Sequence, residues 1–445
     1  MGGNATELQQ IIKRCDRSVL VVICRKMGLK KTATKSNRDL RKWIQQNVND
    51  DNSQTYLKLI NGCLPSISNI VQRAGKRIKS KKRTRDLSSA NQDKERYSMK
   101  NKTCFFPPVQ RLLAIGDLHG DLEATILSLK KADVISQDIS NNEKDIRQIH
   151  WTGGKSFVVQ LGDQIDRVRP SSLYQNLCRP DDPELVEDEG NDLKIMCLFD
   201  QLDKEAREVG GRCISILGNH ELMNADGDFR YVSPREFCEF GNYFRASRSQ
   251  KNRDIPFGYI ERKSAFAPGG VLAKRMAAYR YAVVQVGSWL FVHGSLHPEV
   301  AKKYSLSKIN QSISNWLLNT NKEDTKDIDF LYHNENDTVS PFWSRLYSDH
   351  EDFNDEKKKQ FFETLEYVND VNKNEQSVTA KGMIVGHSPQ FMYGKPMNSD
   401  LDGRLWRVDV GVSRAFGRRE SISDSNLRRV QVLEIVNDKN FNVLS

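Results

Sequence analysis

RLLAIGDLHGDLE, residues 111–123, places an Asp and a His directly behind a short apolar run. The run at 112–115 is typical of a buried parallel strand, and Gly116 ends it. Asp117 and His119 then fall in the turn that follows the strand. Ligands of open α/β sheets bind outside the carboxyl ends of the strands. This turn is therefore a candidate binding position.

The same pattern recurs through residues 109–436. Apolar runs typical of strands alternate there with helical segments, which predicts an α/β fold. The main runs again end in side chains that can bind metal ions. These are Asp163 after VVQLG, Asn219 and His220 after ISILG, His293 after LFV, and His387 after MIVG. Oxygen and imidazole ligands without thiolates predict a site for two divalent cations such as Mn, Fe or Zn.

Five motifs, taken in order, resemble those of the phosphoprotein phosphatase family of metallophosphatases. They are GDLHGD (116–121), GDQIDR (162–167), GNHE (218–221), VHGSLHP (292–298) and VGHS (385–388). Within that family the chain is most similar to the bacterial-type Shewanella-like phosphatase branch. That similarity lies in NHELMNADGDFRYVS (219–233), FWSR (342–345) and DVGVS (409–413). The resemblance implies a calcineurin-like metallophosphoesterase fold, with two mixed β-sheets flanked by helices.

The resemblance also implies a metal-binding role for six residues. Asp117, His119 and Asp163 would hold the first of two divalent metal ions. Asp163 would bridge to the second ion, and the remaining ligands of that ion would be Asn219, His293 and His387. A hydroxide between two such ions is the expected nucleophile.

Further residues are implied in catalysis and phosphate binding. His220 would act as the general acid and protonate the leaving group, while Asp166 would orient His220. The phosphate group would be bound by Arg167, Asn219 and Arg345. Arg230 is either a pocket residue or a salt-bridge partner, and the sequence leaves both readings open. Val168 replaces the family's usual Gly without removing a ligand.

These residues predict an enzyme, a metal-dependent phosphatase that hydrolyses phosphomonoesters on proteins at Ser/Thr or Tyr. One alternative is a nucleotide or dinucleoside polyphosphate phosphoesterase, which uses the same dinuclear core. Many nucleases and nucleotide phosphoesterases end their last motif in GHxH, but here Ser388 and Pro389 follow His387. The other alternative is a binding protein that attaches to nucleic acid or membrane through its basic N-terminus.

The charge of the chain is unevenly distributed. Residues 1–103 carry 24 Lys and Arg against 8 Asp and Glu, whereas residues 104–445 carry 44 against 50. We expect a small basic helical unit at 1–72, which resembles SAP-like modules, and a basic, polar linker at 73–104. The catalytic domain is expected at 105–445, with surface insertions at 178–192 and 319–338. An anionic membrane or nucleic acid is the partner expected for the basic residues, and a phosphoprotein is the expected substrate.

Several features bear on localisation. The eight cysteines form no CxxC pair, which predicts reduced thiols and a cytoplasmic protein. The N-terminal MGGNAT matches a myristoylation motif with Gly2 and Thr6 in place. The basic run at 73–85 is a candidate second membrane signal, and equally a candidate nuclear-localisation signal.

Overall fold

The computed structural model describes residues 102–169, 188–244, 255–320, 326–333, 338–349, 353–416 and 427–445. The chain divides into two units, Met1–Glu95 and Arg96–Ser445, and every described residue belongs to the second unit. The predicted helical unit at 1–72, the myristoylation motif and nearly all of the linker at 73–104 lie outside the described residues.

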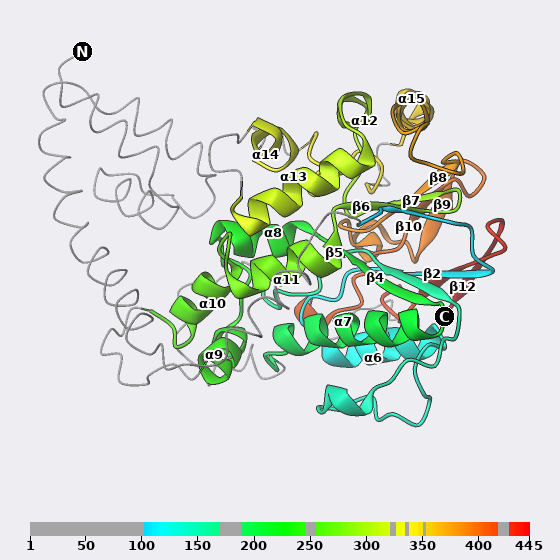
Figure 1. The fold of residues 1–445 in the computed structure, drawn as a ribbon. Coiled ribbons are helices and arrows are strands. Elements are labelled where there is room, and N and C mark those ends of the chain that lie inside the picture. Colours follow the sequence, from blue (N-terminus) through cyan, green and yellow to red (C-terminus); the bar gives the residue numbers. More distant parts are fainter. Residues whose placement is uncertain are drawn as a thin grey trace, which may run out of the picture. The chain divides into compact units, whose positions relative to one another are not determined.

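The described residues form two six-stranded sheets (Figure 1). The first sheet has the order β12-β11-β2-β3-β4-β5, and β2 to β5 are parallel. β11 runs antiparallel to β2, and β12 runs antiparallel to β11. The strands are β2 (Arg111–Ile115), β3 (Phe157–Gln160), β4 (Arg212–Ile216), β5 (Arg280–Tyr281), β11 (Val432–Val436) and β12 (Asn440–Leu444).

The second sheet has the order β1-β6-β7-β8-β10-β9. β7, β8 and β10 are parallel, whereas β6 and β9 each run antiparallel to a neighbour. The strands are β1 (Phe105–Phe106), β6 (Val283–Val286), β7 (Trp289–Val292), β8 (Gly382–Val385), β9 (Asn398–Asp400) and β10 (Leu405–Arg407). Both sheets are mixed, so the predicted fold class is confirmed.

Helices cover the sheets on both sides (Figure 1). α6 and α7 lie side by side against the first sheet, and α12, α13 and α15 lie beyond the second. The α-helices are α6 (Leu122–Lys131), α7 (Asp192–Glu208), α8 (Asn219–Asp226), α9 (Pro234–Tyr243), α10 (Tyr259–Phe266), α11 (Val271–Tyr279), α12 (Pro298–Lys303), α13 (Leu306–Leu318), α14 (Lys326–Leu331) and α15 (Asp355–Val371). Short 3-10 turns occur at Ile146–Gln148, Gln390–Tyr393 and Arg414–Phe416. None of the helices in the described part of the chain is long and apolar enough to cross a membrane.

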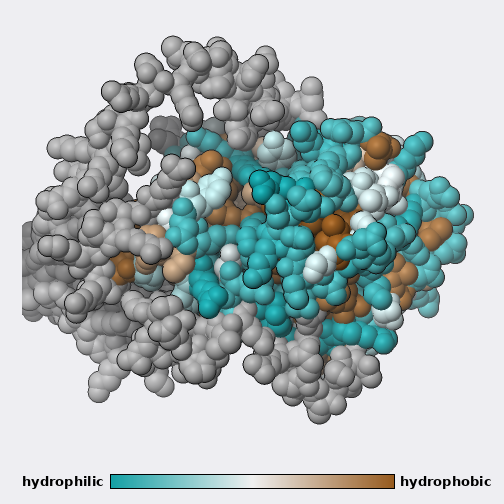
Figure 2. Space-filling model, turned by 90° about the horizontal axis from the view of Figure 1, so that it is seen from below, coloured by the Kyte–Doolittle hydropathy of each residue, from teal (hydrophilic) through white to brown (hydrophobic). Residues whose placement is uncertain are grey.

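The core follows from the burial of the central strands. Every residue of β3, β7 and β8 is buried, because helices or the other sheet cover both faces of these strands. This explains why their sequences are apolar runs, interrupted only by Gln160 at the end of β3, rather than alternating ones. The face seen in Figure 2 is mostly hydrophilic where residues are described, with separate hydrophobic spots.

Two segments expected on the surface are partly buried. Asp192, at the end of the predicted insertion 178–192, begins α7 and is fully buried. Leu331, inside the predicted insertion 319–338, ends α14 and is also fully buried. Both predictions were wrong at these positions, because ion pairing and packing outweigh the high local charge of the sequence.

The burial of β7 gives a stability test. Phe291 is fully buried, where β7 pairs with β6 and β8. We expect Phe291→Ala to lower the free energy of unfolding by about 3–5 kcal/mol, measured by urea denaturation. Met392 is 66% exposed, so Met392→Ala should change the stability by less than about 0.5 kcal/mol. Equal effects of the two substitutions would contradict the position of β7.

Candidate metal centre

Strands from both sheets end at one place. β2 leads to Asp117 and His119, β3 to Asp163, and β4 to Asn219 and His220, which begin α8. From the second sheet, β7 leads to His293 and β8 to His387. A close approach between the sheets requires Gly116, because a Cβ there would lie 2.5 Å from the carbonyl oxygen of Val408. The six predicted metal ligands and His220 thereby come together.

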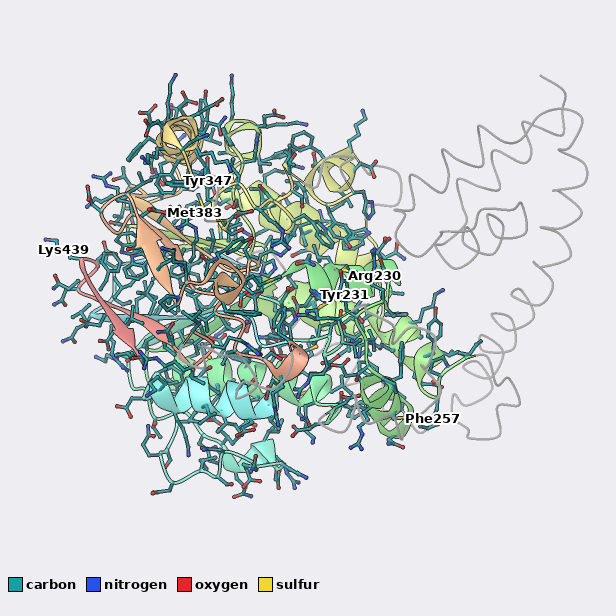
Figure 3. The ribbon with its side chains drawn as sticks, turned by 180° about the vertical axis from the view of Figure 1, so that it is seen from behind. Arg230, Tyr231, Phe257, Tyr347, Met383 and Lys439 are labelled. Carbon is teal, nitrogen blue, oxygen red and sulfur yellow. The ribbon has the colours of Figure 1, made fainter. Side chains whose placement is uncertain are left out.

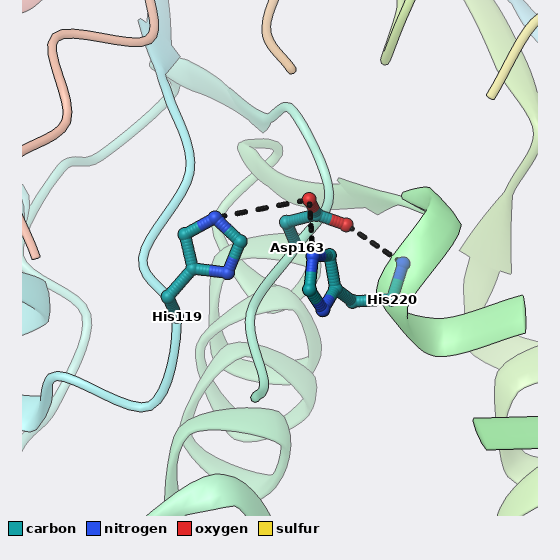
Figure 4. Close-up of side chains that lie close together, drawn as sticks. All are labelled: His119, Asp163 and His220. Carbon is teal, nitrogen blue, oxygen red and sulfur yellow. Dashed lines mark hydrogen bonds and ion pairs between the residues drawn. The ribbon is translucent and has the colours of Figure 1, made fainter. Parts of the chain in front are cut away.

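The Asp163 carboxylate lies at the centre of this cluster (Figure 4). Its Oδ2 is 3.8 Å from Nε2 of His119, 3.8 Å from Nε2 of His220 and 3.3 Å from Nε2 of His293. Its Oδ1 accepts a hydrogen bond of 3.0 Å from the backbone N–H of His220. Asp163 belongs to two groups that could hold an ion, one with His119 and His220, and one with His293 and His387. This is the position that a ligand shared by two ions requires.

Two further carboxylates lie near Asp163. Asp117 Oδ2 is 3.9 Å from Nε2 of His119 and accepts a hydrogen bond of 3.1 Å from the backbone N–H of His387. Burial, with the charges of Asp409 and Asp163, raises the pKa of Asp117 well above its usual range. Burial likewise raises the pKa of Asp409 to about 6. Asp409 was not assigned a role from the sequence, although it follows β10 by two residues, as Asp117 follows β2.

The donor set fits divalent cations. Asp117, Asp163 and Asp409 are each at most 2% exposed, so their negative charges are held out of water. Among the described residues, neither Oδ2 of Asp409 nor Nε2 of His387 has a hydrogen-bond partner, although both atoms are buried. Buried charges and lone pairs of this kind are costly unless a cation or a donor faces them. Carboxylate, amide and imidazole ligands suit Mn, Fe or Zn.

Two histidines are oriented by backbone carbonyl groups. Nδ1 of His119 lies 3.2 Å from the carbonyl oxygen of Ile165, and Nδ1 of His293 lies 2.6 Å from that of Leu161. A proton on each Nδ1 leaves the Nε2 lone pair facing Asp163. Burial, together with the charges of Arg169 and His220, holds the pKa of His119 well below its usual range. For His119 the neutral ring, which is the form that binds metals, is therefore favoured.

The backbone at the site is strained. His119, Asp163, Asp166 and His387 have φ angles of 42°, 50°, 73° and 69°, in the left-handed region that non-glycine residues rarely adopt. Such conformations cost of order 1 kcal/mol or more each and persist only where surrounding contacts hold them. Strain at four neighbouring site residues is typical of a functional site.

Glu221 supplies one such set of contacts. Its carboxylate accepts hydrogen bonds from the backbone N–H groups of Asp163 (3.0 Å), Gln164 (2.8 Å) and Gly218 (2.7 Å). Gly218 is required because a Cβ there would lie only 2.1 Å from Oδ1 of Asp163. The GNHE segment therefore fixes the turn that carries Asp163 as well as providing Asn219 and His220.

His220 and Asp166 form a hydrogen-bonded pair. Nδ1 of His220 is 2.9 Å from Oδ2 of Asp166, the arrangement expected for an orienting carboxylate. Asn224 Nδ2 donates to both carboxylate oxygens of Asp166, at 2.9 and 3.0 Å. Arg262, fully buried on α10, places Nη2 2.9 Å from Asp166 Oδ1. Asn224 and Arg262 were not identified from the sequence.

A third group of acidic side chains is paired with an arginine of the chain itself. Asp166, Asp192 and Glu236 could by their spacing hold an ion. The Arg262 guanidinium pairs with Asp192 at 2.7 Å as well as with Asp166. We therefore interpret this group as a buried salt-bridge network behind His220, and not as another metal site.

The three arginines of interest have different surroundings. Nη1 of Arg167 donates to the carbonyl oxygen of Gly120 (3.3 Å) and lies 3.6 Å from Oδ2 of Asp121. Nη1 of Arg345, which is exposed, donates to Oγ of Ser388 at 2.9 Å beside His387. Arg230 forms an ion pair with Asp228, so the salt-bridge reading is the one that the structure supports.

The fold and the site agree with a comparison to known families. Residues 110–391 match the family model described as calcineurin-like phosphoesterase. The chain belongs to this family. It is therefore a phosphoesterase, and the family's chemistry implies divalent metal ions. The predicted metallophosphoesterase resemblance is confirmed.

Two related sequences are informative. An uncharacterized protein, R398, of Acanthamoeba polyphaga mimivirus is 32% identical over 267 residues, which are 56% of this chain and 98% of the viral protein. Shewanella-like protein phosphatase 2 of Arabidopsis thaliana is 34% identical over 238 residues, 48% of this chain. The alignment spans only 53% of the Arabidopsis protein. The relatives of this phosphoesterase thus include a protein phosphatase of the branch expected from the sequence.

A solved structure shares the fold. The cold-active protein-tyrosine phosphatase of a Shewanella species aligns with a TM-score of 0.51 and 17% identity. The alignment covers 79% of this chain and 84% of that protein. At this identity the likeness shows a common fold, which is the calcineurin-like phosphoesterase fold.

The acidic network of the phosphoesterase predicts a pH dependence of stability. Burial raises the pKa of Glu239 to about 8, with Arg262 and Lys194 opposing the shift and Glu236 adding to it. The native carboxyl group therefore keeps a proton that the unfolded chain releases near pH 4.5, so the free energy of unfolding should fall between about pH 4.5 and 8. Glu239→Gln should flatten this fall, measured by urea denaturation across that range.

The matched control for Glu239→Gln is Glu208→Gln at the exposed end of α7. It should leave the dependence of stability on pH as in the wild type. If Glu239→Gln also leaves it unchanged, the buried carboxyl group does not hold its proton in the native state.

Proposed function

We propose that this phosphoesterase is a metal-dependent protein phosphatase that hydrolyses phosphomonoesters on Ser/Thr or Tyr residues. The central support is the Asp163 carboxylate, which lies within 3.8 Å of three imidazole nitrogens at the ends of strands from both sheets. The name of the Arabidopsis relative supports a protein substrate. So does the retained Asp166–Arg167 pair of the second motif.

The proposed ligands divide into two sets that share Asp163. Asp117 and His119 complete the first set, and Asn219, His293 and His387 complete the second. Two divalent cations held there would polarise the phosphate oxygens and lower the pKa of water, as in other dinuclear phosphatases. Manganese, iron and zinc are the proposed metals, because the ligands are oxygen and nitrogen atoms.

His220 is the proposed general acid. Its Nδ1 is engaged by Asp166 at 2.9 Å, so Nε2 is the atom that can transfer a proton to the leaving oxygen. The Asp166 carboxylate orients the ring, and Asn224 and Arg262 keep that carboxylate in place. General acid catalysis of this kind contributes about 10²–10⁴-fold to a rate.

Arg167, Asn219 and Arg345 are the proposed contacts to the substrate phosphate. Guanidinium groups suit this role because their planar donors match two phosphate oxygens. Arg345 lies beside His387, and Arg167 lies beside Asp121. Residues 1–103, with their positive charge, are proposed to contact an anionic membrane or nucleic acid.

The experiment is turnover of an aryl phosphate and of phosphoserine, phosphothreonine and phosphotyrosine peptides with Mn, Fe or Zn. We expect metal-dependent hydrolysis, abolished by chelation. Asp163→Asn should lower kcat/KM by more than about 100-fold, the upper cost of losing a group that only supports a metal ligand. Asp133→Asn is the matched control, because Asp133 is exposed and has a similar φ of 52°.

Two outcomes would contradict the proposal. Turnover that survives chelation or Asp163→Asn would remove the metal-dependent mechanism. Hydrolysis of nucleotides or dinucleoside polyphosphates, with phosphopeptides left intact, would establish the alternative substrate class.

A further inference from the structure

Arg169 lies at the candidate metal centre although it belongs to none of the sequence motifs. Its guanidinium carbon is 4.4 Å from the ring centre of Phe416 and 5.7 Å from that of Tyr231. The ring of Phe416 is 5.6 Å from that of His119, and the ring of Tyr231 is 4.6 Å from that of His220. Because the rings of His119 and His220 are themselves 4.8 Å apart, the five groups form a closed circle of contacts.

The circle has an inner and an outer side. His119 and His220 are 3% and 6% exposed, and both face Asp163. Arg169, Tyr231 and Phe416 are each partly exposed. These three residues therefore form a partly exposed rim beside the candidate metal centre, and we call them the rim.

The charge of Arg169 lacks an acidic partner in the described part of the chain. The bonds found for its Nη1 go to the backbone carbonyl oxygens of Asp166 (3.2 Å) and Val168 (3.1 Å). No described carboxylate forms an ion pair with Arg169. Burial lowers the pKa of Arg169, whereas the more distant charges of Asp163 and Asp166 oppose that shift. A partly enclosed guanidinium that forms no ion pair with a described carboxylate is suited to bind an anion from outside the chain.

The neighbouring arginines, unlike Arg169, each lie close to a carboxylate. Arg167 lies 3.6 Å from a carboxylate oxygen of Asp121, and Arg414 lies 3.0 Å from the other oxygen of the same group. Arg230, which lies next to Tyr231 in Figure 3, pairs with Asp228 through Nε at 2.9 Å. The guanidinium carbon of Arg230 also lies 5.9 Å from the centre of the Tyr231 ring. Arg230 therefore contacts the same ring as Arg169, but its charge is paired with a carboxylate.

We propose that Arg169 is a substrate-binding residue that holds the phosphate group of the phosphomonoester, with Tyr231 and Phe416 fixing the guanidinium in place. This inference rests on the proposed phosphatase function. The planar guanidinium offers two parallel donors to two phosphate oxygens, and the phosphate dianion supplies the negative charge that the rim lacks. The two aromatic rings contribute cation–π attraction, which limits the side-chain freedom lost on binding.

The test compares Arg169→Gln with Arg230→Gln in the full-length, metal-loaded protein. Isothermal titration with inorganic phosphate measures binding directly, and aryl phosphate kinetics measure KM and kcat separately. Loss of a charge-assisted pair of hydrogen bonds should weaken phosphate binding and raise KM by about 10–100-fold. Arg230→Gln should keep both values near those of the wild type.

Arg169→Lys is the control for a loss of folding in Arg169→Gln. It keeps the charge but not the planar pair of donors, so it should bind phosphate several-fold more weakly with an unchanged unfolding temperature. Wild-type phosphate affinity and KM in both Arg169 variants would overturn the inference while leaving the phosphatase function intact. A wild-type protein without turnover overturns the proposed function instead, and phosphate titration then still decides the role of Arg169.

Discussion

Buried negative charge is the constraint on which the site depends. Asp117, Asp163 and Asp409 lie together at the meeting point of two sheets, each almost fully removed from water. Carboxylates in such surroundings cost several kcal/mol unless a cation compensates them. Around Asp163 the chain supplies imidazoles, and the buried Arg262 is paired with Asp166 and Asp192. The compensation is thus left to the proposed metal ions.

Residues around the site hold Asp163 and His220 in position. Glu221 fixes the turn of Asp163 through three backbone N–H groups, and Gly218 allows the close approach. Behind His220, Asp166 is held by Asn224 and by the buried Arg262. The rim of Arg169, Tyr231 and Phe416 faces solvent instead. The residues proposed for chemistry are therefore held by buried hydrogen bonds, whereas Arg169, one of the residues proposed to bind the substrate phosphate, is partly exposed.

The sequence predicts those site residues that are marked by their immediate neighbours in the chain. An apolar run followed by Asp, Asn or His identifies residues such as Asp117 and His387, because the strand and its ligand are adjacent in the chain. Asp409 also follows a strand, but Arg407 interrupts the apolar run, and Asp409 was assigned no role. Arg262 and Arg169 have no local signal, since their importance depends on contacts with Asp166 and Phe416 far away in sequence. Asp192 was misjudged for the same reason, because its partner Arg262 lies on a distant helix.

Anomalous diffraction from crystals grown with manganese is the most direct test of the shared Asp163 ligand. Two separate peaks should flank the Asp163 carboxylate, one beside His119 and one beside His293 and His387. The distance between them should be about 3.5–4 Å, as in two-metal phosphatases. A single peak, or peaks confined to the acidic group around Arg262, would contradict a dinuclear centre bridged by Asp163.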